Sequence, residues 1–263
     1  MKKTQIMGIL NINNDSFFEK SRVNIHLAQE KIENMIDDGV DIIDIGGLSS
    51  RPESDTISEE EEFKRVKDII DIVYKNRYFE KVIFSLDSYS VLCLDYALSN
   101  GFKIVNDITG LENDDICKIA KKHNATVCIM HMKGNPKDMQ KDPKYEDVVK
   151  EVDSFFAYRI EKAKSFGIKD IILDVGIGFG KNLEHNIELI KQQKHFLHFG
   201  FPLLIGVSRK SMIDKISPSK IEDRLPGTLI AHFEAVRNGA SIVRCHDVKE
   251  HIQALKVFEA LGG

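Results

Sequence analysis

Asp87, Asn106 and Asp174 each come directly after a short apolar segment of the chain. A carboxylate accepts two N–H donors and an amide both donates and accepts, so this set suits the edges of a flat heteroaromatic ring with amino and lactam groups. Each residue alone could instead cap the helix that follows it. Three such residues at equivalent positions favour a ligand site.

Lys210, Arg244 and His246 bring positive charge to the ends of the last two apolar segments. Arg244 suits bidentate contacts with phosphate oxygens, and Lys210 suits them as a point charge. The alternative for each is a solvated surface position. The whole chain has 37 basic and 41 acidic residues, a formal net charge of −4. This balance excludes a general field for nucleic acid or an anionic membrane, so any anion site must be local.

The run Gly176-x-Gly178-x-Gly180-Lys181 differs from the GxxxxGK[ST] phosphate loop in its spacing and in Asn182, which stands where Ser or Thr belongs. Its glycines predict a loop whose backbone approaches a ligand closely, with Phe179 as a stacking face. The alternative is a tight turn with Phe179 in the core.

Three other histidines predict no chemistry. His131 lies between two methionines, which favours packing over proton transfer. His195 and His198 are three residues apart with no third ligand in view, so we expect surface residues rather than a metal site.

Short β-branched segments alternate with longer stretches of helical period along the whole chain. Strands are predicted at Gln5–Leu10, Asp41–Ile45, Val82–Leu86, Lys103–Val105, Thr126–Met130, Asp170–Leu173, Leu203–Gly206 and Ser241–Arg244. Helices are predicted near 25–38, 58–76, 89–99, 112–123, 145–166, 184–193, 222–238 and 247–261. Ser58 and Glu61 predict a capping box, and Gly39, Gly101, Gly167 and Gly239 predict helix ends.

Eight strand–helix units with near-continuous apolar strands predict a parallel sheet. The number of units and the 263-residue length favour a closed (β/α)8 TIM barrel, one domain over residues 1–263, over an open doubly wound sheet. The longest irregular stretches, about 11–24, 46–57 and 131–144, follow strands. In a barrel they lie at the C-terminal rim, where active-site loops are built.

The compartment is predicted from the cysteines and the apolar segments. Cys93, Cys117, Cys128 and Cys245 are scattered without a CxxC pair, which is typical of reduced thiols in a cytoplasmic protein. No segment approaches 18 consecutive apolar residues, so we expect no membrane span.

The segments after the predicted strands resemble those of one enzyme family, the dihydropteroate synthases. All eight occur in the family's order: MGILNINNDSF at 7–17, DIGGLSSRP at 44–52, SLDSY at 85–89, VNDITG at 105–110, MHMKGNPKDMQ at 130–140, LDVGIGFGK at 173–181, GVSRKSMI at 206–213 and VRCHDV at 243–248. The resemblance covers almost the whole chain, and the combination is highly specific.

The resemblance implies a transferase of folate biosynthesis that joins 6-hydroxymethyl-7,8-dihydropterin diphosphate to p-aminobenzoate and needs Mg²⁺. It also implies a sulfonamide target and a homodimer. The resemblance implies that the pterin pocket is formed by Asp87, Asn106, Asp174 and Lys210. It implies that the diphosphate and Mg²⁺ bind near Asn11, Arg244 and His246, with Asn11 as metal ligand. It also implies that p-aminobenzoate is covered by a loop with Ser50, Arg51 and Pro52, and that further substrate contacts come from Met130, Phe179 and Gly206. The predicted catalytic residues are Asp15, Lys210, Arg244 and His246.

The first loop departs from the family pattern, because Asn13 and Asn14 replace Thr and Pro and 18–21 replaces a Ser-Asp-Gly-Gly run. Ser50 replaces a Thr, which would alter the discrimination between p-aminobenzoate and sulfonamides. Three alternatives stay open at this point: a pterin-dependent methyltransferase barrel, a binding-only paralogue, and an aldolase with Lys210 as a Schiff-base nucleophile. The neighbouring Ser208 and Arg209 tell against the neutral lysine that an aldolase needs.

Overall fold

The computed structural model describes residues 4–12, 22–48, 57–135 and 138–263 of the chain, without the side chains of 22–24. Its eight strands are all parallel and form a closed barrel in sequence order. Their bounds are β1 Gln5–Asn11, β2 Ile42–Gly46, β3 Ile83–Asp87, β4 Ile104–Asp107, β5 Thr126–Met130, β6 Ile171–Asp174, β7 Leu203–Ile205 and β8 Ile242–Cys245. The predicted (β/α)8 barrel is therefore confirmed.

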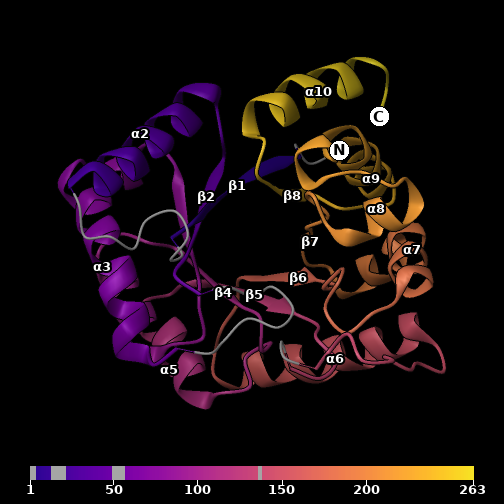
Figure 1. Cartoon of the computed structure of the whole chain (residues 1–263). Helices are drawn as coiled ribbons and strands as arrows, with labels where there is room; N and C mark the ends of the chain where they lie inside the picture. Colours follow the sequence, from indigo (N-terminus) through magenta and orange to yellow (C-terminus); the bar gives the residue numbers. More distant parts are fainter. Residues whose placement is uncertain (1–3, 13–21, 49–56, 136–137) are drawn as a thin grey trace.

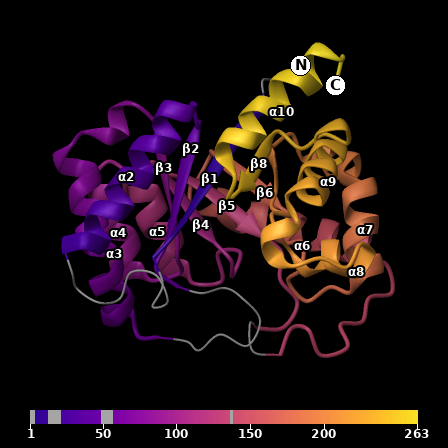
Figure 2. The ribbon, with the colours of Figure 1, turned by 45° about the horizontal axis from the view of Figure 1, so that its top comes forward.

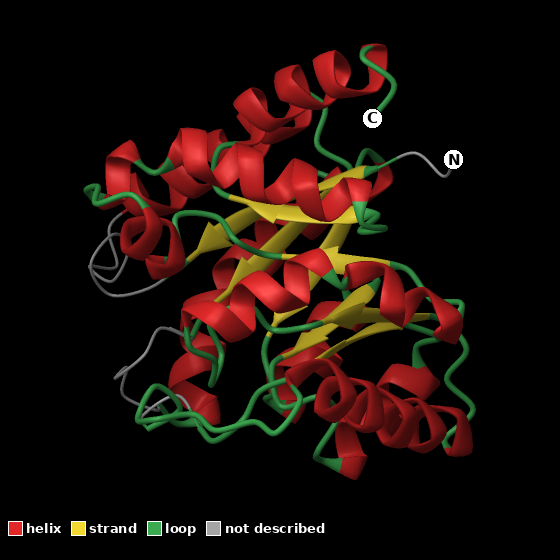
Figure 3. Ribbon diagram, turned by 90° about the vertical axis from the view of Figure 1, so that its right-hand side faces the viewer, coloured by secondary structure: helices red, strands yellow, loops and turns green. Residues whose placement is uncertain are grey.

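The helices surround the strands (Figure 1). In Figure 2, α2, α3 and α4 lie on one side of the barrel and α6, α7 and α9 on the other. Figure 3 shows the strands side by side within this shell. The helices are α2 Arg22–Asp38, α3 Glu59–Lys75, α4 Val91–Ser99, α5 Asp114–Lys122, α6 Val148–Ser165, α7 Leu183–Lys191, α8 Ser211–Ile216, α9 Leu225–Arg237 and α10 Val248–Ala260, with 3-10 turns η1 Tyr78–Glu80, η2 Gln193–Phe199 and η3 Ile221–Asp223.

The sequence predicted the eight long helices but not α8 or the 3-10 turns. Gly39, Gly101, Gly167 and Gly239 follow helices with positive φ, as expected of glycines that end helices. At the start of α3 the Ser58 side chain accepts from the Glu61 amide, whereas the Glu61 carboxylate pairs with Arg65. The capping box is thus only half formed.

Two clusters of buried apolar side chains stabilise the barrel. The larger one lies between the strands and the helices and includes Ile43, Phe84, Phe156 and Phe196, all fully buried. The smaller one, called here the apolar layer, consists of seven buried residues from seven strands: Met7, Ile42, Ile104, Cys128, Ile172, Leu204 and Ile242. These residues are linked by the strand register, in which Met7 pairs with Ile42, Cys128 with Ile172 and Leu204 with Ile242. Residues paired in this way project to the same face of the sheet, so the apolar layer fills the barrel interior.

Side chains alternate faces along a strand, so the interior position that follows each member of the apolar layer is two residues further on. Four of these later interior positions carry Asp44, Asn106, Asp174 and Arg244. Together with Asp87, which ends β3 and pairs with Asn106, these residues are called here the polar layer. The register continues through them, since Asp87 pairs with Asn106 and Met130 pairs with Asp174. The strand period therefore delivers the predicted site residues to the C-terminal end of the barrel interior.

All four cysteines are buried free thiols, as predicted. Within the described residues no helix has both the length and the hydropathy needed to cross a bilayer.

Candidate active site

Arg244 is the centre of the polar layer. Its Nε donates to Asp44 Oδ2 over 2.6 Å, and its Nη2 donates to Asp87 Oδ2 over 2.7 Å. The guanidinium is 19% exposed, whereas Asp44 is fully buried. Strands β2, β3 and β8 are thus joined across the barrel by one cation held between two carboxylates.

Asp44 is a site residue that the sequence did not predict. It lies inside the apolar strand β2 rather than at its end. Its Oδ2 also accepts from Asn106 Nδ2 over 3.0 Å, while its buried Oδ1 has no hydrogen-bond partner among the residues that the structure describes. A carboxylate within an otherwise apolar strand was itself the available signal, because a buried charge needs a partner.

The electrostatics of this cluster are set by burial and by competing charges. Burial raises the pKa of Asp87 to about 7; Arg244 opposes this rise, and the neighbouring Asp44 adds to it. Burial alone would lower the pKa of Arg244, but the Asp44 and Asp87 carboxylates hold it above its usual value. Arg244 therefore stays charged, and Asp87 is the group that titrates near neutral pH.

Asp174 ends β6 next to the glycine-rich loop. Its Oδ1 accepts from the Gly176 amide over 2.8 Å. Burial raises its pKa, and the nearby Lys210 cation opposes that rise. Asp174 and Lys210 therefore belong to one electrostatic cluster with Arg244.

Two glycines of this loop, which was expected to let backbone approach a ligand, lie close to the backbone of the loop after β5. A Cβ on Gly176 would lie 1.9 Å from the His131 carbonyl oxygen, and one on Gly180 would lie 2.1 Å from that of Lys133. Both glycines also have positive φ. Their missing side chains let the loop after β6 pack on the loop after β5. Phe179 lies partly exposed at the surface of this loop, so it is not a core residue.

Lys181, which the sequence did not predict as a positioning residue, joins these two loops. Its buried Nζ lies 2.9 Å from His131 Nδ1 and donates to the backbone carbonyls of His131 and Phe179 over 3.2 and 3.0 Å. Burial lowers the pKa of Lys181 well below its usual value. Burial, together with the Lys181 charge, lowers the pKa of His131 to about 2. His131 packs edge-on against Phe155 with ring centroids 4.9 Å apart, which confirms its predicted packing role.

Lys210 precedes α8 and reaches over the glycine-rich loop. Its Nζ donates to the Ile177 carbonyl and lies 4.7 Å from the centroid of the Phe179 ring. Removal of the Lys210 ammonium group from water lowers its pKa to about 8, although the negative charge of Asp174 opposes this shift. Ser208 and Arg209, which were expected to tell against a desolvated, neutral lysine, turn their side chains to the loop after β8 and do not keep Lys210 solvated. With a pKa of about 8, Lys210 still carries its proton at neutral pH, as expected.

A buried pair of histidines, also not predicted, joins the loops after β7 and β8. The Val207 amide donates to His232 Nε2 over 2.9 Å, so the proton of His232 must lie on Nδ1. That Nδ1 donates to His251 Nε2 over 2.9 Å, and His251 Nδ1 donates to the Asp247 carbonyl over 2.6 Å. The chain of hydrogen bonds links the Val207 backbone after β7 to the backbone of Asp247, the residue that follows His246.

The structure places the other predicted residues around the polar layer. His246 Nδ1 lies 2.9 Å from Ser208 Oγ. Met130 is buried at the end of β5, and a Cβ on Gly206 would lie 3.9 Å from Arg244 Cβ. Asp15, Ser50, Arg51 and Pro52 lie outside the described residues.

Asn11 offers an oxygen ligand beside an acidic strand end. A Cβ on Gly46 would lie 3.3 Å from Asn11 Oδ1 and 3.8 Å from Asp87 Oδ2. The missing side chain therefore leaves a cradle between an amide oxygen and a carboxylate. Mg²⁺ prefers such hard oxygen donors and is commonly held by few protein ligands together with substrate phosphates. The donor set fits the magnesium ion that the resemblance implied.

Comparisons with known proteins agree with this geometry. A family model described as pterin binding enzyme matches residues 7–246. The Helicobacter pylori bifunctional dihydropteroate synthase/dihydropteroate reductase is 42% identical over 98% of this chain and 68% of its own length. The dihydropteroate synthase of Haemophilus influenzae is 39% identical over 97% of this chain and 93% of its own.

Solved structures show the same relationship. The Yersinia pestis dihydropteroate synthase, in a complex with a sulfonamide drug, superposes with a TM-score of 0.92 at 36% identity, covering 99% of this chain and 94% of that one. The Xanthomonas albilineans dihydropteroate synthase with 4-aminobenzoic acid has a TM-score of 0.91 at 30% identity, covering 100% and 94%. The chain therefore belongs to the dihydropteroate synthases, a family of pterin-binding transferases of folate biosynthesis.

Proposed function

We propose that the polar layer is where this chain carries out its reaction, the condensation of 6-hydroxymethyl-7,8-dihydropterin diphosphate with p-aminobenzoate to give 7,8-dihydropteroate and diphosphate. The observation that carries the proposal is Arg244, held between Asp44 and Asp87 at the C-terminal end of the barrel. In this fold, active sites lie at that end.

Asn106, Asp174 and Lys210 bind the pterin ring in this proposal. Asp174 supplies acceptors for the ring's amino and N–H donors, and Asn106 is oriented by its bond to Asp44. Lys210 supplies a donor for the ring carbonyl, and Phe179, beneath the lysine, supplies an apolar face. Met130 closes the pocket from the end of β5.

The diphosphate lies at Arg244 and His246, with Gly206 keeping the space beside Arg244 open. Asn11 and the diphosphate oxygens would hold Mg²⁺. When bound, the ion supplies charge neutralisation of the leaving group. Asp44 holds the guanidinium in place, which lowers the reorganisation needed when charge develops on the departing oxygen.

The step itself needs no protein nucleophile. The bond between the exocyclic methylene carbon and the diphosphate oxygen breaks, and the electron pair leaves with diphosphate. The methylene carbon is then cationic and conjugated to the pterin, and the lone pair of the arylamine nitrogen forms the new C–N bond. The nitrogen finally releases a proton to solvent. The carboxylates of Asp87 and Asp174 favour this cationic state electrostatically.

The loop residues stay predictions. Asp15 is expected to stabilise the cation or to position the metal, and Ser50, Arg51 and Pro52 are expected to cover p-aminobenzoate. All four lie outside the described residues.

The homodimer and the cytoplasmic location are further proposals. Tyr158 on α6 and Ile230 on α9, 67% and 75% exposed, provide apolar surface that a second copy would cover. Buried free thiols suit a reducing compartment. Light scattering should give twice the 29.9 kDa mass of the chain, and a monomer at micromolar concentration would contradict the dimer.

The reaction is tested by measuring diphosphate release from the pterin substrate, with and without p-aminobenzoate and Mg²⁺. We expect rapid release only when both are present, and loss of the magnesium effect in Asn11→Ala. Failure to release diphosphate under any condition would contradict the synthase reaction. Full release in Mg²⁺-free buffer containing a chelator would contradict the role given to Asn11.

A further inference from the structure

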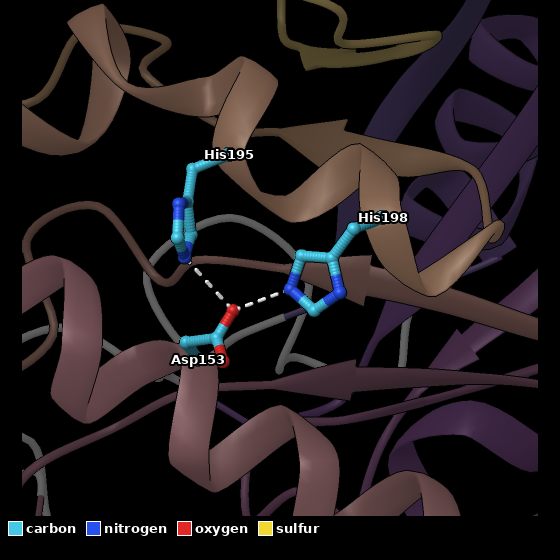
Figure 4. Close-up of side chains that lie close together, drawn as sticks. All are labelled: Asp153, His195 and His198. Atoms are coloured by element: carbon cyan, nitrogen blue, oxygen red, sulfur yellow. Dashed lines mark hydrogen bonds and ion pairs between the residues drawn. The ribbon is translucent and has the colours of Figure 1, made fainter.

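Asp153, His195 and His198 form a cluster on the outside of the barrel, separate from the polar layer (Figure 4). Asp153 lies on α6, and both histidines lie on η2. Asp153 Oδ1 is 3.0 Å from His195 Nε2 and 2.6 Å from His198 Nε2. One potential ligand atom from each residue lies within 4.8 Å of the other two.

The 3-10 geometry of η2 brings the two imidazoles together. With three residues per turn, residues three apart stand one above the other on the same side of the helix. Figure 4 shows both rings pointing from η2 toward the carboxylate on α6. Both histidines are exposed, as expected, and a possible third ligand that was not in view in the sequence comes from another helix.

Aromatic neighbours restrict both rings. His198 packs against Phe199 with centroids 3.9 Å apart and the rings tilted by 37°, and His195 meets the fully buried Phe196 edge-on at 5.4 Å. Each ring is thereby held with its Nε2 toward the same oxygen. Little side-chain freedom remains to be lost when an ion binds.

We propose that Asp153, His195 and His198 form a binding site for a divalent transition-metal ion of the Zn²⁺ type. Two imidazoles and one carboxylate are a donor set that such ions prefer, and their half-exposed positions leave a fourth coordination position to water. Ligand bonds of about 2.0–2.2 Å in a tetrahedron separate donors by about 3.3 Å. The two separations between Asp153 and the histidines, 3.0 and 2.6 Å, need to open only slightly to reach this value.

Such an ion would cross-link η2 to α6. It would stabilise the folded chain, because the three ligands are brought together only by folding. Its ligands differ in kind from the oxygen donors near Asn11, which suit Mg²⁺. A site that acts in this way raises the melting temperature and leaves turnover unchanged.

The test uses the full-length enzyme, freed of metal with a chelator and dialysed. Zn²⁺ is titrated by calorimetry, and Co²⁺ is titrated by visible absorption, which reports its coordination geometry. We expect one equivalent to bind outside the active site, with affinity falling at least tenfold in His195→Ala, in His198→Ala and in Asp153→Ala. His123→Ala is the matched control, since His123 contacts a carboxylate, Asp95, over 2.7 Å without a second histidine.

A second control separates this site from the active site. In His246→Ala the equivalent assigned to the cluster should persist, and Zn²⁺ should still raise the melting temperature. Melting curves without metal check that each variant folds. Binding that is lost with His246 but kept in all three cluster variants would overturn the proposal. So would an equal loss in His123→Ala, or no binding of Zn²⁺ up to millimolar concentration.

Discussion

Four residues of the polar layer come from strands that also supply the apolar layer, and each stands one step of the strand period further on. Ile42 precedes Asp44 on β2, Ile172 precedes Asp174 on β6, and Ile242 precedes Arg244 on β8. All three isoleucines are at most 4% exposed. One strand register therefore positions both layers: the apolar layer stabilises the barrel, and the polar layer carries the chemistry.

The two layers bury very different groups. Apolar side chains gain from burial, whereas each buried charge must be compensated by partners. Within the described part of the chain, the polar layer meets this requirement only partly. Arg244 is shared by two carboxylates, and Asp44 Oδ1 has no hydrogen-bond partner there. In the proposed complex, a ligand supplies the missing partners: its N–H groups donate to carboxylate oxygens, and its dianionic or trianionic tail faces the Arg244 cation. The polar layer is therefore arranged for a ligand rather than for maximal stability.

Arg244→Ala should break the polar layer most severely. It removes the cation facing the diphosphate, so kcat/KM should fall by about 1,000-fold or more, equivalent to about 4 kcal/mol. It also leaves Asp44 and Asp87 without their partner, which should lower the free energy of unfolding by about 3–5 kcal/mol. Diphosphate-release kinetics and urea denaturation measure the two effects. A loss of activity below tenfold would show that Arg244 does not act on the diphosphate.

Ile242→Ala is the matched change two residues earlier on the same strand. Loss of a buried isoleucine side chain should lower the free energy of unfolding by about 2–5 kcal/mol. At a temperature where the variant is fully folded, kcat/KM should stay within about twofold of the wild type. Urea denaturation and initial rates provide the comparison. A variant with normal stability and lost activity would reverse the roles of the layers.

The pH dependence of kcat/KM should report Asp87 of the polar layer and the neighbouring Lys210, and not the apolar layer. Below the pKa of about 7, Asp87 takes up a proton and Arg244 loses a charged partner. Above the pKa of about 8, Lys210 loses its proton and its positive charge. We expect a maximum between these values and a fall of about tenfold per pH unit on either side.

Lys210→Arg sharpens the pH experiment. Because arginine stays charged, the fall of kcat/KM on the alkaline side should move to higher pH. Ile242→Ala should keep the wild-type profile. Equal rates from pH 6 to pH 9 in the wild type would contradict the titrations assigned to Asp87 and Lys210.

The sequence predicted the barrel and most of its rim because strand ends are local features. Asp87, Asn106, Asp174 and Arg244 stand where apolar segments stop, and the fold brings such ends together. Lys210 lies close enough to Asp174 to oppose the rise of its pKa, but its sequence neighbours did not show that it would be desolvated.

The missed residues depend on partners that are remote in the sequence. Asp44 is recognised as a site residue by its contact with Arg244, and Lys181 is recognised as a positioning residue by its contact with a backbone carbonyl of another loop. His232 gains its role from His251, and His195 with His198 from Asp153. The spacing of residues along one chain segment cannot show contacts made across helices or across the barrel.

The central claim is that the pterin binds at the polar layer and not elsewhere on the same strands. Calorimetric titration of the pterin substrate into Asp174→Asn and Ile172→Ala tests it on β6 alone. Asp174→Asn should weaken binding by about 100-fold with little change in melting temperature, because it removes a charged acceptor from the ring. Ile172→Ala should melt at a lower temperature and bind with wild-type affinity. Wild-type affinity in Asp174→Asn, or equal losses of affinity in both variants, would contradict the account.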